Sequence, residues 1–304
     1  MNRFVIFCIA LLAALPPLAA QDKLGHPHIT GVHHVRIYVS DIAKSRVFYG
    51  DVLGLPLADY RCEQKSHSCF AITWGPTKQY IELEQAPSPA PKNWLAEIAF
   101  ATDDVTKMRQ YLLAHGVKAG PIGKGSNSTQ HFDLHDAEGN LISFVGFFDP
   151  TIDDPPYYEA VSKDLIHAGF VVKERPAMDR FYKEILGFHV YWHGGMKDDQ
   201  TDWVDMQVPD GTAWVEFMLN VPLGADKHTL GVMNHIALGV SDIHDAQRQL
   251  IKNGWKGTEQ PKIGRDGKWQ LNLYDPDDTR VELMEFTPTQ KPCCSDYSGP
   301  HPKP

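Results

Sequence analysis

Residues 166–172 (IHAGFVV) return later in the chain as residues 234–240 (NHIALGV), each an apolar run of strand length with a histidine in second place. Each run leads into a helix-like segment and then into a second apolar run that carries a glutamate, Glu216 within residues 213–219 and Glu282 within residues 280–286. The separation from histidine to glutamate is 49 residues in one copy and 47 in the other. This recurrence predicts a chain built from repeated units.

Two earlier copies share the pattern. Residues 34–39 alternate polar and apolar side chains, as a strand does, and a capped helix is expected from residue 42 to about residue 53, where Gly54 ends it. His34 and His167 lie 133 residues apart, as do Phe48 and Phe181, and residues 104–116 recur as residues 242–254. Each unit is therefore predicted to be a strand, a helix and three strands.

The repeat predicts an α+β fold of four βαβββ modules, paired into two curved-sheet half-barrel domains. One module cannot bury both faces of a short sheet, whereas two modules can close a curved sheet around a cleft. We place the N-terminal pair at residues 30–149 and the C-terminal pair at residues 157–288, joined by the Asp- and Pro-rich residues 149–156. Residues 289–304, rich in Pro and Ser, are predicted to be a flexible tail.

The start of the chain and its charge bound the location and the partners. Residues 1–20 combine a short positive segment, an apolar run too short to span a membrane and a small-residue end, which predicts a signal peptide and a secreted or periplasmic protein. The formal charge of −9, with no Lys/Arg-rich run, argues against nucleic acid and, after signal cleavage, against a membrane as partner. A small-molecule ligand is expected, and a homo-oligomer stays open.

The two histidines and two glutamates of the C-terminal pair are the candidate metal ligands. Alternate side chains of a strand share a face, so His167 shares a side with Gly169, and His235 shares a side with Ala237 and Gly239. If those sides face inward, His167, Glu216, His235 and Glu282 surround a cleft, and the small residues leave room for a ligand beside the metal. Neutral imidazole and carboxylate suit one divalent ion of Zn, Ni, Fe, Co or Mn.

The chain resembles the vicinal oxygen chelate superfamily, which includes glyoxalase I, methylmalonyl-CoA epimerase, extradiol dioxygenases and bleomycin-resistance proteins. The motifs that carry the resemblance lie between about residues 30 and 288, and their fourfold recurrence is more specific than any one of them: HHV at 33–35, FY and LG at 48–54 and 181–187, DAEGN at 136–140, and DP to EL at 275–283. The resemblance implies metal ligation by the four residues at His, Glu, His and Glu positions.

The first half has a degenerate version of the site. Its repeat-equivalent residues are His34, Glu82, Glu97 and Ser143, and Arg36 replaces the small Gly169. We expect a filled pocket in which Arg36 pairs with Glu82 or Glu97, because a guanidinium satisfies carboxylates with fixed donors. A weak second metal site at His34, Glu82 and Glu97 is the alternative.

Three functions remain open. A glyoxalase-like lyase or isomerase would chelate a small oxygenated substrate and use Glu216 or Glu282 as the general base for proton transfer. An extradiol dioxygenase would use His167, His235 and Glu282 as its iron triad, although residues 266–276 depart from that family's pattern. A binding protein without catalysis is the third. We expect an enzyme, and we expect the first reaction, because Glu216 adds a fourth donor.

Cysteines and aromatic residues give two further expectations. Cys62 and Cys69 flank a polar turn that allows a disulfide across a hairpin, but the sequence leaves the pairing of Cys62, Cys69, Cys293 and Cys294 open. Strand residues that could shape the pocket are Tyr191, Trp192, His193, Trp203, Trp214 and Trp269.

Overall fold

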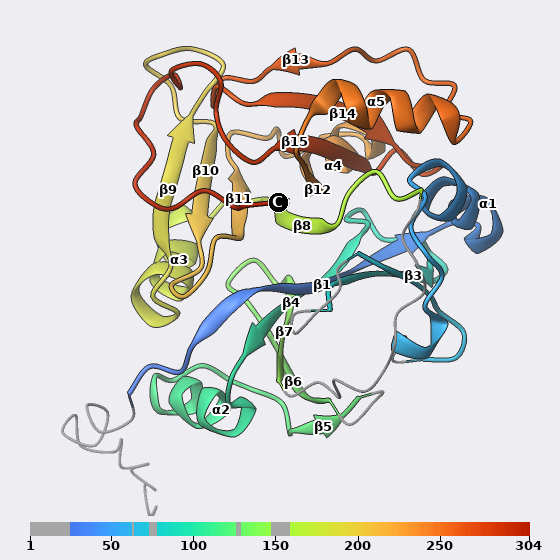
Figure 1. Ribbon diagram of the computed structural model, residues 1–304. Coiled ribbons are helices and arrows are strands. Elements are labelled where there is room, and N and C mark those ends of the chain that lie inside the picture. The colour runs from blue at the N-terminus through green and yellow to red at the C-terminus, as the bar shows by residue number, and fades with distance from the viewer. Residues whose placement is uncertain (1–24, 63, 73–77, 126–128, 147–158) are drawn as a thin grey trace, which may run out of the picture.

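Two mixed sheets, each formed by one half of the chain, make up the core of the protein (Figure 1). The computed structural model describes residues 25–62, 64–72, 78–125, 129–146 and 159–304, so the predicted signal peptide and the predicted linker at 149–156 lie outside the described residues. Helices α2 (Val105–Ala114) and α5 (Ile243–Lys252) lie on the outer sides of the two sheets, and the predicted α+β architecture of paired βαβββ modules with curved sheets is confirmed.

The first sheet has the order β2-β3-β1-β4-β7-β6-β5. Its central strands β1 and β4 run antiparallel, and each pairs in parallel with the last long strand of its own module, β3 or β7. The strands are β1 Ile29–Val39, β2 Ser68–Ala71, β3 Tyr80–Gln85, β4 Leu95–Thr102, β5 Gly123–Lys124, β6 Gln130–His135 and β7 Leu141–Gly146.

The second sheet repeats this plan with the order β13-β14-β15-β12-β8-β11-β10-β9. Strands β8 and β12 are the antiparallel centre, and β11 and β15 pair with them in parallel. The strands are β8 Asp164–Val171, β9 His189–Gly194, β10 Trp203–Gln207, β11 Trp214–Met218, β12 His235–Val240, β13 Lys262–Ile263, β14 Trp269–Tyr274 and β15 Arg280–Glu285.

The helices follow the repeat. In the first module, α1 (Ile42–Arg46) begins after Asp41, whose side chain accepts hydrogen bonds from two backbone N–H groups, and it continues as the π-helix η2 (Val47–Val52) up to Gly54, which has a φ of +67°. The third module has the same break, from α3 (Arg175–Asp179) to the π-helix η5 (Arg180–Ile185). The second and fourth modules carry α2 (Val105–Ala114) and α5 (Ile243–Lys252). Two short helices were not predicted, η3 (Asp59–Arg61) and α4 (Lys227–Met233).

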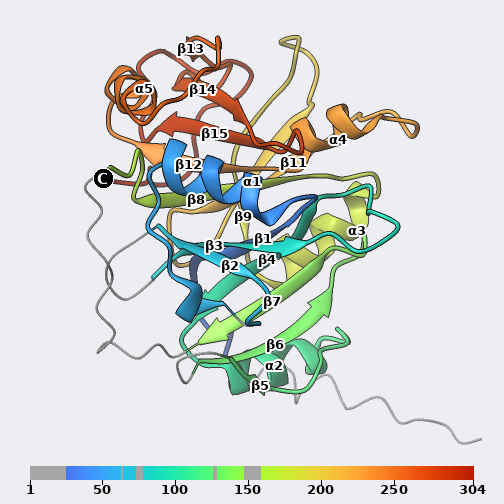
Figure 2. The same ribbon diagram turned by 90° about the vertical axis from the view of Figure 1, so that its right-hand side faces the viewer.

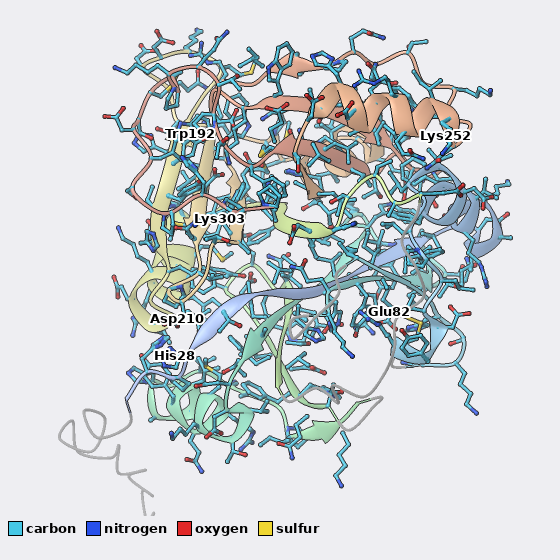
Figure 3. The ribbon with its side chains drawn as sticks, viewed as in Figure 1. His28, Glu82, Trp192, Asp210, Lys252 and Lys303 are labelled. Carbon is cyan, nitrogen blue, oxygen red and sulfur yellow. A yellow bond between two sulfur atoms is a disulfide. The ribbon has the colours of Figure 1, made fainter. Side chains whose placement is uncertain are left out.

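The two halves are tied together by reciprocal contacts. The hydroxyl of Tyr49 donates to Asp275, and the hydroxyl of its repeat-equivalent Tyr182 contacts Asp136, so the helix of one half bonds to the last turn of the other half in both directions. His28, just before β1, pairs with Asp210 in the β10–β11 turn at 2.8 Å (Figure 3). Figure 2 shows the first sheet beneath the second with α1 at their junction.

The C-terminal segment, which its composition predicts to be flexible, contacts the second sheet. Figure 1 shows it running back beside β9 toward the centre of the second sheet. The indole of Trp192 donates to the Cys293 carbonyl, the hydroxyl of Tyr297 donates to the Asp266 carbonyl, and Pro302 is buried. The structure therefore packs this segment against the second sheet, and flexibility of the tail stays a prediction from its composition.

Disulfides join Cys62 to Cys69 and Cys293 to Cys294, two pairings that the sequence left open. Among the described residues, no helix has both the length and the apolar character needed to cross a membrane.

Candidate metal centre

The four candidate ligands come from four neighbouring strands, β15, β12, β8 and β11. His167 lies in β8 and Glu216 in β11, whereas His235 begins β12 and Glu282 lies in β15. In register, Gly169 of β8 stands beside both Glu216 and His235, and Ala237 of β12 stands beside both His167 and Glu282. The small residues therefore alternate with the four polar side chains across the centre of the sheet.

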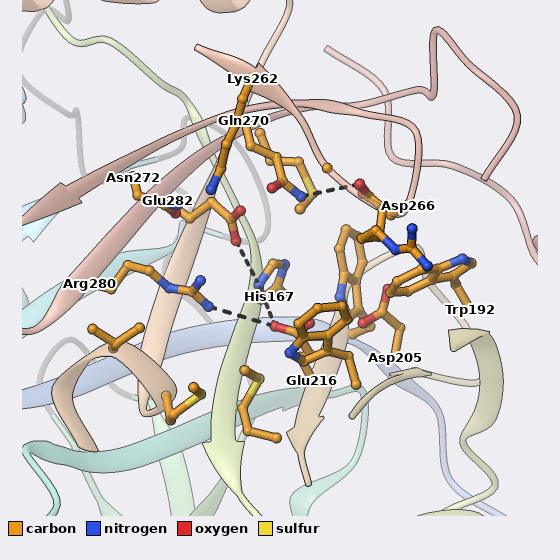
Figure 4. Close-up of a pocket in the computed structure, with 18 of the residues that line it drawn as sticks. His167, Trp192, Asp205, Glu216, Lys262, Asp266, Gln270, Asn272, Arg280 and Glu282 are labelled. Carbon is orange, nitrogen blue, oxygen red and sulfur yellow. Dashed lines mark hydrogen bonds and ion pairs between the residues drawn. The ribbon is translucent and has the colours of Figure 1, made fainter. Parts of the chain in front are cut away.

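All four side chains converge on one point, and Figure 4 shows His167, Glu216 and Glu282 turned toward one another. The Nε2 atoms of His167 and His235 are 3.1 Å apart. An Oε2 atom of Glu216 lies 3.0 Å from His235 Nε2 and 3.7 Å from His167 Nε2. An Oε2 atom of Glu282 lies 3.7 Å from His167 Nε2 and 3.9 Å from His235 Nε2. The structure thus brings the predicted residues together, while their role as metal ligands stays a prediction.

The protonation states suit a cation. Burial lowers the pKa of the His167 and His235 imidazoles well below the usual value, so both are neutral. The Nδ1 of His235 lies 3.1 Å from the Met233 carbonyl, and donation to this oxygen leaves the Nε2 lone pair aimed at the shared point. Burial raises the pKa of both Glu216 and Glu282 to about 7. Two facing imidazole Nε2 atoms between two buried carboxylates are a donor set that fits one divalent metal ion.

The small residues make room for side chains, which corrects the expectation that they leave space for a ligand. A Cβ at Gly169 would lie 2.0 Å from Cε1 of His235, so the glycine admits the imidazole itself. A Cβ at Gly239 would lie 2.3 Å from the Phe286 ring, away from the histidines. The open space lies elsewhere.

A cavity of about 350 Å³ opens beside the four residues. Of the aromatic residues suggested by the sequence, Trp192, Trp203 and Trp214 line it, whereas Tyr191, His193 and Trp269 do not. Its other walls combine methionines with charged groups from the β13–β14 hairpin and β15, namely Met196, Met218, Met233, Met284, Lys262, Arg265, Asp266 and Arg280. The cavity is thus apolar on one side and strongly charged beside the candidate ligands.

Sequence reasoning missed Arg280 as a pocket residue. Its side chain is only 13% exposed, and its Nη2 lies 2.6 Å from His235 Nε2 and 4.0 Å from a Glu216 oxygen. Its Nε has no hydrogen-bond partner among the described residues. The signal was available, because Arg280 lies two residues before Glu282 in the same strand and so shares its side of the sheet.

Lys268 and Asp205 were missed as well, because both types are expected at the surface. Lys268 is fully buried, and its Nζ sits 4.6 Å from the Trp214 ring centre and 5.3 Å from those of Tyr191 and Tyr297. Asp205 stands opposite Glu216 in register, and burial together with the Glu216 charge raises the pKa of its carboxyl well above the usual range. These groups surround the candidate ligands with further charge that residue type alone did not reveal.

In the first half the side chain of Arg36 supplies the positive charge beside the buried carboxylate, as predicted. Arg36 Nη2 lies 2.5 Å from a Glu97 oxygen, with both side chains largely buried, and Ser143 donates to Glu97. His34 Nε2 is 3.8 Å from Glu97, while Glu82 bonds to His67 instead. His34, Glu82 and Glu97 do not form one of the close ligand groups among the described residues, so the alternative of a metal at these three is not supported.

Comparisons with known proteins give a family and a fold. A model described as Glyoxalase/Bleomycin resistance protein/Dioxygenase superfamily matches residues 31–144 and 164–283. A search of curated proteins finds no match.

Several solved structures resemble the chain over most of its length. Homoprotocatechuate 2,3-dioxygenase from Brevibacterium fuscum, in complex with 3,4-dihydroxyphenylacetate, has a TM-score of 0.61 at 20% identity, over 89% of this chain and 83% of that one. The enzyme of the same name from Arthrobacter globiformis has a TM-score of 0.63 at 19% identity, over 90% and 84%. A variant of the B. fuscum enzyme gives 0.64 at 21% identity, over 94% and 77%.

Proposed function

Because this chain belongs to the Glyoxalase/Bleomycin resistance protein/Dioxygenase superfamily, we propose that it is a metal-dependent enzyme that chelates a small oxygenated substrate and catalyses proton transfer on it. One observation carries the choice of reaction. Glu216 faces both histidines at 3.0 and 3.7 Å, so the site offers a carboxylate beyond the two histidines and Glu282. A carboxylate at that place can serve as a general base.

His167, His235, Glu282 and Glu216 would hold one divalent ion of the group Zn, Ni, Fe, Co and Mn. An ion held by these residues would supply Lewis-acid chemistry, polarising substrate oxygens and making a neighbouring C–H bond more acidic. Glu282 is the more enclosed carboxylate, with 4% of its side chain exposed against 13% for Glu216. Glu216 is therefore the carboxylate better placed to accept a proton from substrate carbon at an Oε atom and to return it to the adjacent carbon or oxygen.

Arg280 would fix the charged end of the substrate. Its guanidinium meets the Nε2 lone pair of His235 at 2.6 Å. When that lone pair is engaged by a metal, the Arg280 donors need a different acceptor, and an anionic oxygen of the substrate supplies one. The tryptophans and methionines of the opposite wall would exclude water from the remainder of the substrate.

A ring-cleaving dioxygenase is the second candidate, and a specific observation favours it. Ligand atoms of His167, His235 and Glu282 lie within 4.8 Å of one another, as two histidines and one carboxylate must to form an iron triad. The similar structures include an enzyme in complex with a catechol acid, 3,4-dihydroxyphenylacetate. Glu216 weighs against this candidate, because it places a further negative charge beside the triad.

Two assays on protein purified without chelator distinguish the candidates. Metal content is measured first. Solvent deuterium exchange into small α-hydroxy carbonyl compounds then reports proton transfer, and oxygen uptake with catechols reports ring cleavage. We expect exchange, and we expect Glu216→Gln to slow it by about 10²- to 10⁴-fold while metal is retained.

Glu184→Gln, at an exposed carboxylate of η5, is the control and should leave exchange unchanged. Oxygen uptake on catechols without exchange would replace proton transfer by ring cleavage, and protein that binds no metal under any condition would reject both. Export, proposed from residues 1–20, is checked by cell fractionation and N-terminal sequencing of the mature chain.

A further inference from the structure

A second cluster of metal-binding side chains lies in the first half, about the β2–β3 pair. Cys62 follows η3, Cys69 lies in β2, and Glu82 of β3 stands directly opposite Cys69 in the antiparallel register. One ligand atom from each of these three residues lies within 4.8 Å of the others. His67, in the turn before β2, places its Nδ1 2.6 Å from a Glu82 oxygen. All four side chains are buried.

Glu82 is the residue in this cluster that most needs a partner. It is fully buried, and only Oε1 has a hydrogen bond, to His67; Oε2 has no partner among the described residues. A buried carboxylate oxygen that meets no donor and no cation is costly. The nearby cations are engaged elsewhere, since Arg36 pairs with Glu84 and Glu97, and Arg61 donates to the carbonyls of residues 78 and 79. The unpartnered Oε2 of Glu82 therefore indicates that the cluster can bind a ligand at this oxygen.

We propose that Cys62, Cys69 and Glu82 form a binding site for one borderline-soft divalent ion, Zn²⁺ being the best match, when the Cys62–Cys69 disulfide is reduced. Two thiolates and a carboxylate are donors that Zn²⁺ accepts in tetrahedral geometry, and His67 orients the carboxylate through its 2.6 Å contact with Glu82. The Cα atoms of the two cysteines are 5.5 Å apart. Two sulfurs each about 2.3 Å from one tetrahedral ion lie roughly 3.8 Å from each other, a separation that side-chain rotation can reach from this backbone.

The chemistry balances with a dithiol as reductant. The dithiol gives two electrons and two protons to the disulfide, whose S–S bond breaks to leave two thiols, and the dithiol becomes a cyclic disulfide. The metal ion then displaces the two thiol protons into solvent as the thiolates bind. The disulfide and the metal exclude each other, because both use the same two sulfur atoms.

Comparison of the halves supports a site of different metal preference. Cys69 stands opposite Glu82 as Asp205 stands opposite Glu216, so Glu82, the repeat equivalent of a second-half candidate ligand, has a sulfur where Glu216 has a carboxylate. The second half thus presents only nitrogen and oxygen donors around its glutamate, and the first half presents sulfur. Sulfur donors select softer ions than carboxylates do, so the two sites should not compete for the same metal on equal terms.

Co²⁺ titration under argon tests the proposal, because thiolate coordination gives cobalt a near-ultraviolet charge-transfer band that imidazole and carboxylate do not. The full-length chain carries His235→Ala, Cys293→Ser and Cys294→Ser, which weakens the second-half site and removes the other cysteines. It is reduced with a dithiol, freed of reductant and compared with the oxidised chain. We expect one equivalent of Co²⁺ with the thiolate band in the reduced chain only, displaced by Zn²⁺.

Two variants decide the ligand set. Glu82→Gln should weaken Co²⁺ binding at least about tenfold. Glu184→Gln, at an exposed carboxylate of η5 in the other half, should leave it unchanged. The unsubstituted chain, oxidised against reduced, is run in parallel so that a folding defect of the variants cannot decide the result. A reduced chain without the band, or the same band in a Cys62→Ser, Cys69→Ser chain, overturns the proposal.

Discussion

Replacing Gly169 by alanine should cost the protein most of its metal affinity without touching a ligand. An added Cβ would lie 2.0 Å from Cε1 and 2.4 Å from Nδ1 of His235, whereas ordinary contact begins at 3.4 Å. The ring must therefore shift by about 1.4 Å, although His235 is fully buried and held by the Met233 carbonyl. Metal–ligand distances tolerate only about 0.2 Å, so we expect affinity to fall by at least about 10- to 100-fold.

Chelator competition measures the affinity, and thermal unfolding with and without metal measures its effect on stability. At metal concentrations of about 100 times the dissociation constant, the natural chain gains about 2.7 kcal/mol, and a variant with 100-fold weaker binding gains only about 0.4 kcal/mol. Gly239→Ala is the control. Its Cβ would meet Phe286 at 2.3 Å, so overpacking should cost about 1–3 kcal/mol while metal affinity stays as it was. A Gly169→Ala protein that binds metal as tightly as the natural chain would refute the assignment of His235 as a ligand.

Three further predictions concern the surroundings of the site. The pKa of Glu216 and of Glu282 is raised to about 7 in the metal-free chain, so protons compete with metal below that pH. Metal affinity, measured by chelator competition, should therefore rise up to about pH 7 and level off above it. A midpoint near pH 4.5 would contradict this. Lys268→Met removes a buried positive charge beside the proposed dication and should tighten metal binding in the same assay, so weaker binding would show that Lys268 acts by holding the aromatic rings in place. Tyr297→Ala should lower the free energy of unfolding by about 1–3 kcal/mol in urea titrations. An unchanged urea midpoint would show that the C-terminal segment is only loosely held.

The repeat made most of the fold predictable. Two periodicities can be read directly from the sequence: the alternation of polar and apolar side chains within a strand, and the spacing of equivalent residues between modules. Residue pairs such as His34 and His167 then align one half of the chain on the other. The convergence of the four candidate ligands followed from the same alignment, since equivalent positions in paired modules face each other across the centre of the sheet. The length of the modules left little freedom for any other pairing.

The features that escaped prediction depend on contacts between segments far apart in the chain. Lys268 is buried because Tyr191, Trp214 and Tyr297 from three different segments close around its ammonium group. The tail is held by groups on β9 and on the β13–β14 hairpin that no local pattern connects to it. Residue type predicts only the average exposure of such side chains, and here contacts with particular aromatic partners bury them instead.

The difference between the two halves comes down to what one position of the central strand admits. Gly169 stands in register beside Glu216 and His235, and the absence of a side chain lets the His235 ring reach the shared point. Arg36, its repeat equivalent, stands beside Glu82 and Glu97 and supplies a guanidinium to the carboxylate at 2.5 Å. A buried carboxylate needs a positive partner in either half. In the first half Arg36 is that partner and fills the space between the carboxylates. In the second half Arg280 lies 4.0 Å from a Glu216 oxygen, and the glycine leaves a set of imidazole and carboxylate donors that can take an exchangeable cation as well. The same sheet therefore yields a structural ion pair in one half and, as we propose, a reactive metal centre in the other.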